Sequence, residues 1–190
     1  MAGMCTVADA AGGNRFLTHH SLLQLILEAG KQSRETDPKA FEAVRLVGVA
    51  HGITNALRTS IPVMSTTGKL VIPVELTEKH GVRSPRYLLS ALGQGDEECL
   101  QAMENAVRDM VKCARDHLQS ARDLRPAILE EPHGAQSVAA LLPGLASETF
   151  LNRLERSHFR LTDRNLRNVG TIEHATCSLR LLQGYVRRSY

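Results

Sequence analysis

Apolar residues recur at helical spacing along most of the chain. This spacing predicts a first helix from Phe16 to Gly30, with Thr18 as its N-cap, and its apolar stripe consists of Leu22, Leu23, Ile26 and Leu27. The Asp37-Pro38 pair predicts the start of a second helix, because an acidic N-cap followed by proline in the first turn is a common start signal.

The second predicted helix runs from Pro38 to about Arg58. Its apolar residues cover more than one face, which predicts a central and largely buried helix. Pro62 and the Ser, Thr and Gly residues of 65–68 are expected to break it. An extended run from Leu70 to Val74 and a short helix from Glu75 to His80, closed by Gly81, are expected to follow.

The longest periodic segment runs from Asp96 to Leu124 and predicts the longest helix. Shorter helices are predicted for Ser84–Ala91 before a turn at 93–95, for Ala135–Leu142, for Glu148–His158 with Ser147 as its cap, and for a final segment from Asn165 or Val169 to Val186. No convincing alternation marks a sheet. We therefore predict an all-α helical bundle, with residues 1–15 as a flexible tail and residues 16–190 as a single helical domain.

Composition narrows the chemistry of the chain only slightly. Aromatic residues make up 4% of the chain and tryptophan is absent, so the core must consist of aliphatic side chains, which suits packed helices. The net charge of +3 permits contact with acidic partners without arguing for them. The four cysteines (Cys5, Cys99, Cys113 and Cys177) form no CxxC pair, so neither a zinc site nor a disulfide framework is expected. No apolar run reaches the roughly 18 residues of a membrane-spanning helix, and Met1–Asn14 does not read as a targeting signal.

Residues 47–82 carry the most specific pattern in the sequence. Residues 48–58 read GVAHGITNALR, residues 68–73 read GKLVIP, and His80-Gly81-Val82 closes the segment. This pattern resembles the C-terminal half of the squalene/phytoene synthase family, where GxAxQxTNxLRD leads through an acidic turn to GRxYLP and a short helix ending in FGV. The resemblance covers about Phe16 to Tyr190 and is closer to the family's mitochondrial branch of complex I assembly factors. It implies an isoprenoid-synthase-like half-fold.

Two departures from the family pattern argue against catalysis. Active members hold diphosphate through Mg²⁺ bound by two Asp-rich motifs, and Mg²⁺ prefers carboxylate oxygens. Thr59 stands where the resemblance places the first Asp of the second motif, and no Asp or Glu occurs between Glu42 and Glu75. The 190 residues also hold no counterpart of the family's N-terminal half, where the first motif lies. We therefore expect a non-catalytic protein with no catalytic residue, no cofactor and no metal site.

Four residues are candidates for a relic of the family's binding cleft: His51, Asn55, Arg58 and Lys69. The resemblance places Arg58 and Lys69 on either side of the turn where the family binds diphosphate. His51 and Asn55 lie one helical turn apart and share a face. The alternative interpretation is structural: Arg58 and Lys69 as solvated cations at a helix end, and His51 and Asn55 as polar groups satisfied between helices.

The resemblance implies an assembly factor or structural subunit of a mitochondrial respiratory-chain complex, in the matrix or on the matrix face of the inner membrane. Its partners would be protein subunits of that complex, because a bundle without the family's other helices would expose apolar faces that need cover.

Two other functions stay open. From Glu148 onward the chain is rich in arginine, which would suit contact with anionic lipid or with RNA, for example in the mitochondrial ribosome. A DNA partner is not expected. The chain could also be half of a split prenyl-diphosphate transferase, although such an enzyme needs carboxylates that this half lacks.

Overall fold

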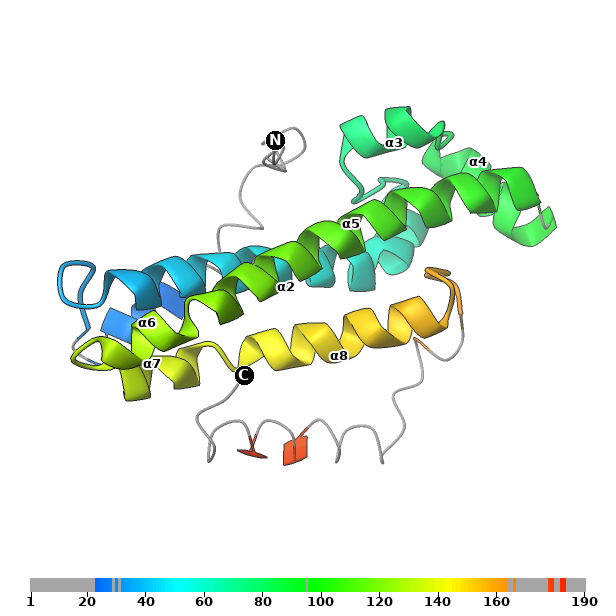
Figure 1. Ribbon diagram of the computed structural model, residues 1–190. Helices are drawn as coiled ribbons and strands as arrows, with labels where there is room; N and C mark the ends of the chain where they lie inside the picture. Colours follow the sequence, from blue (N-terminus) through cyan, green and yellow to red (C-terminus); the bar gives the residue numbers. More distant parts are fainter. Residues whose placement is uncertain are drawn as a thin grey trace.

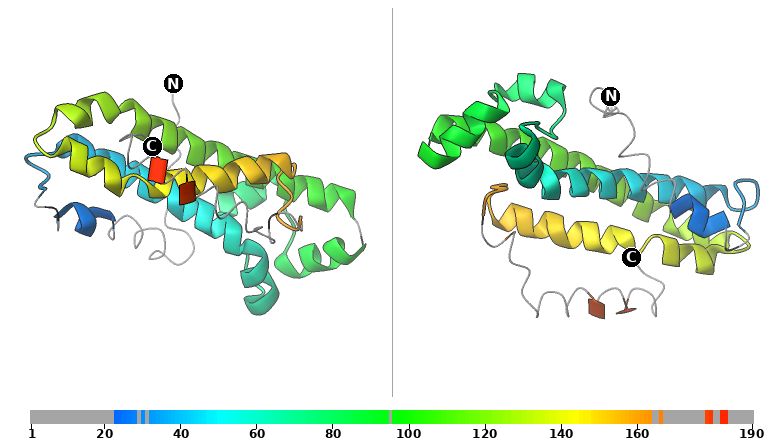
Figure 2. Two further views of the ribbon diagram at one scale, coloured as in Figure 1. Left: turned by 90° about the horizontal axis from the view of Figure 1, so that it is seen from below. Right: turned by 180° about the vertical axis from the view of Figure 1, so that it is seen from behind.

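Three long helices lie side by side and form the body of the protein (Figures 1 and 2). The computed structural model describes residues 23–28, 30, 32–94, 96–163, 166, 178–179 and 182–183. Its helices are α2 (Pro38–Thr67), α3 (Val74–His80), α4 (Pro85–Gln94), α5 (Glu97–Asp123), α6 (Arg125–Glu130), α7 (Gly134–Ala140) and α8 (Pro143–Arg156), and residues 23–28 are helical as well. These residues contain no strand, so the predicted all-α class is confirmed. In the same part of the chain, no helix has the length and hydropathy needed to cross a membrane.

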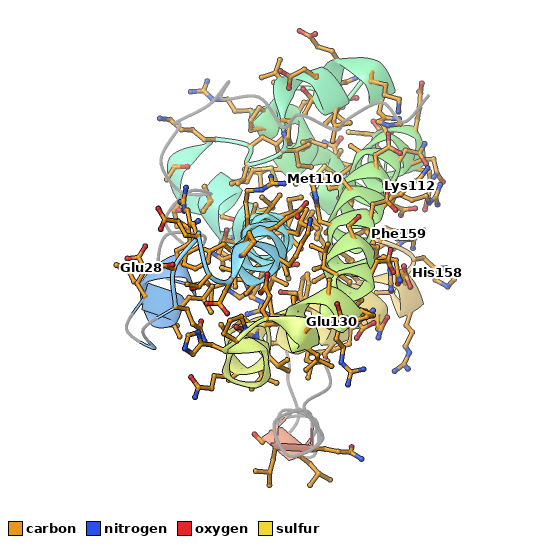
Figure 3. The ribbon with its side chains drawn as sticks, turned by 60° about the vertical axis from the view of Figure 1, so that its left-hand side comes forward. Glu28, Met110, Lys112, Glu130, His158 and Phe159 are labelled. Carbon is orange, nitrogen blue, oxygen red and sulfur yellow. The ribbon has the colours of Figure 1, made fainter. Side chains whose placement is uncertain are left out.

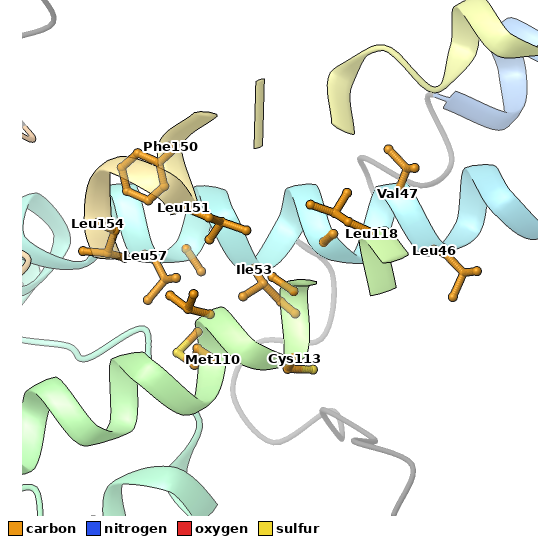
Figure 4. Close-up of a cluster of buried hydrophobic side chains, with 14 of the residues drawn as sticks. Leu46, Val47, Ile53, Leu57, Met110, Cys113, Leu118, Phe150, Leu151 and Leu154 are labelled. Atoms are coloured by element: carbon orange, nitrogen blue, oxygen red, sulfur yellow. The ribbon is translucent and has the colours of Figure 1, made fainter. Parts of the chain in front are cut away.

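The core lies where α5 and α8 pack against α2 (Figure 4). Its side chains are almost entirely aliphatic; they include Val47, Ile53 and Leu57 of α2, Met110 and Leu118 of α5, and Leu151 and Leu154 of α8. Helix α5 has one apolar face, and Figure 3 shows Met110 directed toward α2 while Lys112 points outward. This arrangement agrees with the periodicity that predicted α5 from the sequence.

Helix α2 is longer than the sequence predicted, because the predicted break at Pro62 does not occur. The helix continues to Thr67 and ends at Gly68, whose φ of 65° is left-handed. Proline removes one backbone hydrogen bond of the helix. Ser60 and Met64, on either side of it, are each only 1% exposed, and their burial favours continuing the helix. Five hydroxyls also bond back to carbonyl oxygens four residues earlier, at 2.7–2.9 Å, instead of turning the chain: those of Thr59, Ser60, Ser65, Thr66 and Thr67.

The other elements predicted before α5 differ from the structure in particular residues. Ile26 is 50% exposed, whereas Leu23 and Leu27 are buried, so one of the three stripe residues that the structure describes faces the solvent. The run 70–73 is irregular rather than a strand, and Val74 already belongs to α3. Residues 93–94 finish α4 instead of forming a turn.

The predictions after α5 need two corrections. Helix α6 was not predicted; Pro126 lies in its first turn, where proline is favoured. Helix α8 starts at Pro143, which places Ser147 inside it rather than at its cap. Residues 1–15, residues 16–22 of the predicted first helix and most of the predicted final helix lie outside the described residues; 178–179 and 182–183 are helical.

The start of α2 is capped by residues almost a hundred positions away. The Glu131 carboxylate, between α6 and α7, accepts hydrogen bonds from the backbone N–H groups of Lys39 (2.6 Å) and Ala40 (3.1 Å). In return, the buried Asp37 carboxylate accepts hydrogen bonds from the backbone N–H of His133 and from Thr36 Oγ1, and it lies 3.1 Å from His133 Nδ1. We call Asp37, Glu131 and His133 the N-terminal clasp of α2. An anion is favourable at this end of a helix, where backbone N–H groups lack partners within the helix.

Candidate functional site

Three of the four predicted cleft residues lie on one helical face of α2, which turns toward α8. His51, Asn55 and Arg58 follow one another at intervals of four and three residues, and α2 packs directly against α8. The half-buried His51 places Nδ1 3.0 Å from the Ser147 hydroxyl of α8. Asn55 is half-buried, and its backbone carbonyl accepts the Thr59 hydroxyl at 2.9 Å.

Arg58 packs on an aromatic ring of α8. Its guanidinium carbon lies 5.0 Å from the centre of the Phe150 ring, within the range of a cation–π contact. Phe150 is 7% exposed, and the Arg58 side chain covers it from the solvent side. This face of α2 is therefore engaged in packing against α8, through contacts that include the His51–Ser147 hydrogen bond and the Arg58–Phe150 cation–π contact.

Lys69 is separated from the other three residues. The predicted turn between Arg58 and Lys69 is helical up to Thr67, and nine helical residues rise by about 14 Å. Lys69 is exposed beyond the C-cap, and its backbone N–H donates to Thr67 Oγ1 at 3.3 Å. The prediction that Arg58 and Lys69 flank a turn is therefore wrong, because the intervening residues continue α2.

The segment that follows Arg58 does not fit the Mg²⁺ site of the family's active members. The Thr59 hydroxyl donates to carbonyl oxygens of its own helix, at 2.9 Å to Asn55 and 3.4 Å to Ala56. Ile61, Pro62 and Val63 bring no oxygen donor in their side chains. Within the described ranges, no group of three or more His, Cys, Asp or Glu side chains could hold a metal ion.

The His51–Ser147 pair has the spacing of a base and a nucleophile, but its surroundings fit a structural contact. Ser147 is 1% exposed, so a substrate cannot reach its hydroxyl. That hydroxyl also donates to the Pro143 carbonyl at 3.2 Å, which leaves its oxygen to accept from the imidazole. The pair joins α2 to α8, and an activated serine would require an open site beside it.

Charged side chains of α5 form a second set of contacts, which the sequence suggested only as a solvated face of mixed sign. Arg115 makes a two-pronged ion pair with Glu155 of α8, at 2.7 Å for each hydrogen bond. Arg122 bonds Glu148 of α8, and Arg160 bonds the largely buried Glu104, each at 2.7 Å. Arg160, from the arginine-rich end of the chain, is thus paired with a carboxylate of α5, and this pairing raises the pKa of Arg160.

A third contact ties the end of α3 to α5. Lys79 Nζ and His80 Nε2 lie 2.5 and 2.9 Å from the same carboxylate oxygen of Asp109. Hydrogen bonds from Lys79 and His80 hold the pKa of Asp109 below its usual range. Sequence spacing could not reveal these partners, since they lie about 30 residues apart on different helices.

The chain is similar to two curated proteins. It is 32% identical to the "NADH dehydrogenase (ubiquinone) complex I, assembly factor 6 homolog" of Drosophila melanogaster over 148 residues. These residues cover 78% of this chain and 40% of the relative. It is 31% identical over 143 residues to the protein of the same name in Dictyostelium discoideum, covering 75% of this chain and 36% of the relative. The chain thus spans about two fifths of the length of these relatives. No solved structure matches it significantly. The family model "Squalene/phytoene synthase" matches residues 17–171, and the chain therefore belongs to the squalene/phytoene synthase family.

Proposed function

We propose that this chain is a non-catalytic member of its family that takes part in the assembly of mitochondrial complex I. The observation that carries the proposal is the match of most of the chain to two proteins named as complex I assembly factors. Localisation to the mitochondrion, in the matrix or on the matrix face of the inner membrane, follows from the same proposal. The partners would be subunits or further assembly factors of complex I.

The non-catalytic part of the proposal is supported by the geometry after Arg58. Diphosphate chemistry with Mg²⁺ needs carboxylates that neutralise and orient the cation. In α2 the corresponding hydroxyls of Thr59 and Ser60 are bonded to the helix backbone, and the nearest acidic residues in the sequence are Glu42 and Glu75. The face that carries His51 and Arg58 is used for packing against α8. These features suit a fold kept as a scaffold for protein contacts.

The first prediction concerns catalysis. When the purified protein is incubated with farnesyl or geranylgeranyl diphosphate and Mg²⁺, we expect no condensed product, because the part of α2 that follows Arg58 has no carboxylate to hold the metal. Product analysis by mass spectrometry, with an active squalene synthase in a parallel reaction, measures this. Any condensed isoprenoid formed by the protein would contradict the non-catalytic proposal and favour a split prenyl-diphosphate transferase.

The second prediction concerns assembly. Deleting the gene in the source organism is expected to lower the amount of mature complex I on native gels, and re-expressing the full-length protein is expected to restore it. Mitochondrial translation is measured in the same cells by pulse labelling. A general loss of translation products would favour the ribosomal alternative. Normal complex I in the deleted cells would contradict the proposed function.

A further inference from the structure

The surface of α4 combines exposed apolar and basic side chains. Helices α3 and α4 lie at one end of the bundle, away from α6 and α7, and both pack on α5 (Figures 1 and 2). Leu88 and Ala91 of α4 are buried. Five neighbouring side chains are exposed, and we call them the α4 surface: Arg83, just before the helix, and Arg86, Tyr87, Leu89 and Ser90 on it. Leu89 and Ser90 follow Arg86 at intervals of three and four residues, and Ser90 follows Tyr87 at three, so these side chains are neighbours on the helix. Arg83, just before the helix, adjoins them by packing on the Tyr87 ring.

Tyr87 is exposed and yet held at both ends. Its hydroxyl donates to the Asp96 carboxylate at 2.8 Å, and the Arg83 guanidinium carbon lies 4.5 Å from the centre of its ring. The hydrogen bond to Asp96 raises the pKa of Tyr87, so the phenol stays protonated at neutral pH. A ring that is 38% exposed adds little to the core. Because its rotamer is already fixed, however, it loses little conformational entropy when a partner covers it.

The α4 surface itself carries no acidic residue; Asp96, Glu97 and Glu98, which follow it in the sequence, open α5. No Asp or Glu occurs between Glu78 and Asp96, and Asp96 already accepts the Tyr87 hydroxyl. Nearby, Lys79 and His80 are both paired with Asp109. Arg86 makes no hydrogen bond or ion pair with the described residues, and it lies one helical turn from Leu89, which is 37% exposed.

We propose that the α4 surface docks an acidic segment of a partner protein, with carboxylates against Arg83 and Arg86 and apolar side chains against Tyr87 and Leu89. Arginine and tyrosine beside apolar area are the residue types that dominate binding at protein interfaces. An anionic membrane fits less well, because two cations contribute only about 2 kcal/mol of attraction to its surface. The partner is taken to belong to complex I assembly, so the inference rests on the proposed function.

The test uses the full-length protein, expressed in cells that lack the endogenous gene. A photoreactive benzoylphenylalanine replaces Leu89, and in a control it replaces Leu129, which is 44% exposed on α6. We expect crosslinks from position 89 to an acidic peptide of a complex I subunit or assembly factor, and not from position 129. When Arg86→Glu is added to the variant with the photoreactive residue at position 89, the yield of the crosslink is expected to fall about tenfold or more, as for an interface hot spot. The matched control Lys112→Glu, an exposed cation on α5, is expected to leave the yield unchanged.

A second step tests charge complementarity and folding. Replacing the crosslinked carboxylate of the partner with lysine is expected to restore the yield lost in Arg86→Glu. All variants are expected to melt within about 2 °C of the original protein, because surface substitutions change stability little. Crosslinks to lipid or to a basic peptide would overturn the proposal, as would equal losses with Arg86→Glu and Lys112→Glu.

The two proposals fail in different ways. Normal complex I in cells without the gene contradicts the proposed function. If cells without the gene lack complex I, and the Arg86→Glu protein restores it as fully as the original protein does, only the proposed role of the α4 surface is contradicted.

Discussion

Replacing Gly134 with alanine is expected to lower the free energy of unfolding by about 3 kcal/mol, at the upper end of overpacking effects. A Cβ atom at Gly134 would overlap the carbonyl oxygen of Ile128 and lie 2.8 Å from its carbonyl carbon and 2.9 Å from Leu129 Cα. These are backbone atoms of α6, so no side chain can rotate away to make room. The start of α7 would have to move away from α6, and the adjoining residue His133, which contacts Asp37, would move with it. Equilibrium unfolding in urea measures the change.

Gly144→Ala is the matched control for this substitution. Gly144 also lies in the first turn of a helix, but a Cβ there would meet only side chains, at 3.4 Å for Leu118 Cδ2 and 3.6 Å for Val47 Cγ1. These are ordinary contact distances, and alanine favours helix over glycine by up to about 1 kcal/mol. We therefore expect no loss, or a small gain, of stability. Equal losses in the two variants would show that the α6–α7 contact is not the cause.

The sequence predicted those helices whose signals are local. Helix α5 was predicted to within a residue at each end, because Asp96 caps it through the backbone N–H of Cys99 at 3.1 Å and its apolar period is unbroken. The extension of α2 was missed because it depends on distant contacts. Pro62 and the hydroxyl residues read as a break, whereas the burial of Met64 in the core favours continuing the helix.

The candidate site could be predicted only in part, for the same reason. The missing carboxylates after Arg58 are visible in the sequence, because a ligand type is either present or absent there. That His51 bonds Ser147, and that Arg58 covers Phe150, depends on how α8 packs against α2, with more than ninety residues between the partners. The N-terminal clasp was hidden likewise: the sequence indicated Asp37 as an N-cap, but its side chain bonds His133 while Glu131 caps the helix.

Replacing Asp37 with asparagine is expected to cost about 3 kcal/mol of stability near neutral pH, because buried hydrogen-bond donors lose their charged acceptor. The Asp37 carboxylate is fully buried and receives hydrogen bonds from Thr36 Oγ1 at 2.6 Å and from the His133 backbone N–H at 3.1 Å. Asparagine keeps the shape of the side chain but loses the charge. Its amide keeps one acceptor oxygen but puts an NH2 donor where the second carboxylate oxygen accepted a hydrogen bond.

The loss should depend on pH with a defined sign. Burial alone would raise the pKa of Asp37, but hydrogen bonds from Thr36 and His133 outweigh it and hold the pKa below its ordinary value of 3.8. A carboxylate with a lowered pKa contributes its full stabilisation above that ordinary value and loses it as the pH falls through the folded-state pKa. The difference in stability between the original protein and Asp37→Asn should therefore be constant from about pH 5 to 7 and shrink at lower pH.

Urea unfolding at a series of pH values measures this difference, and Asp116→Asn provides the control. Asp116 is exposed on α5, so its substitution is expected to change stability by less than about 0.5 kcal/mol near neutral pH. A difference for Asp37→Asn that stayed constant to about pH 2, or that grew as the pH fell, would mean that the folded protein does not lower this pKa. A difference that grows as the pH falls, beginning above the ordinary value, would indicate the opposite shift, with burial outweighing the hydrogen bonds. Whether the difference shrinks or grows as the pH falls therefore shows which of these two opposing effects dominates in the clasp.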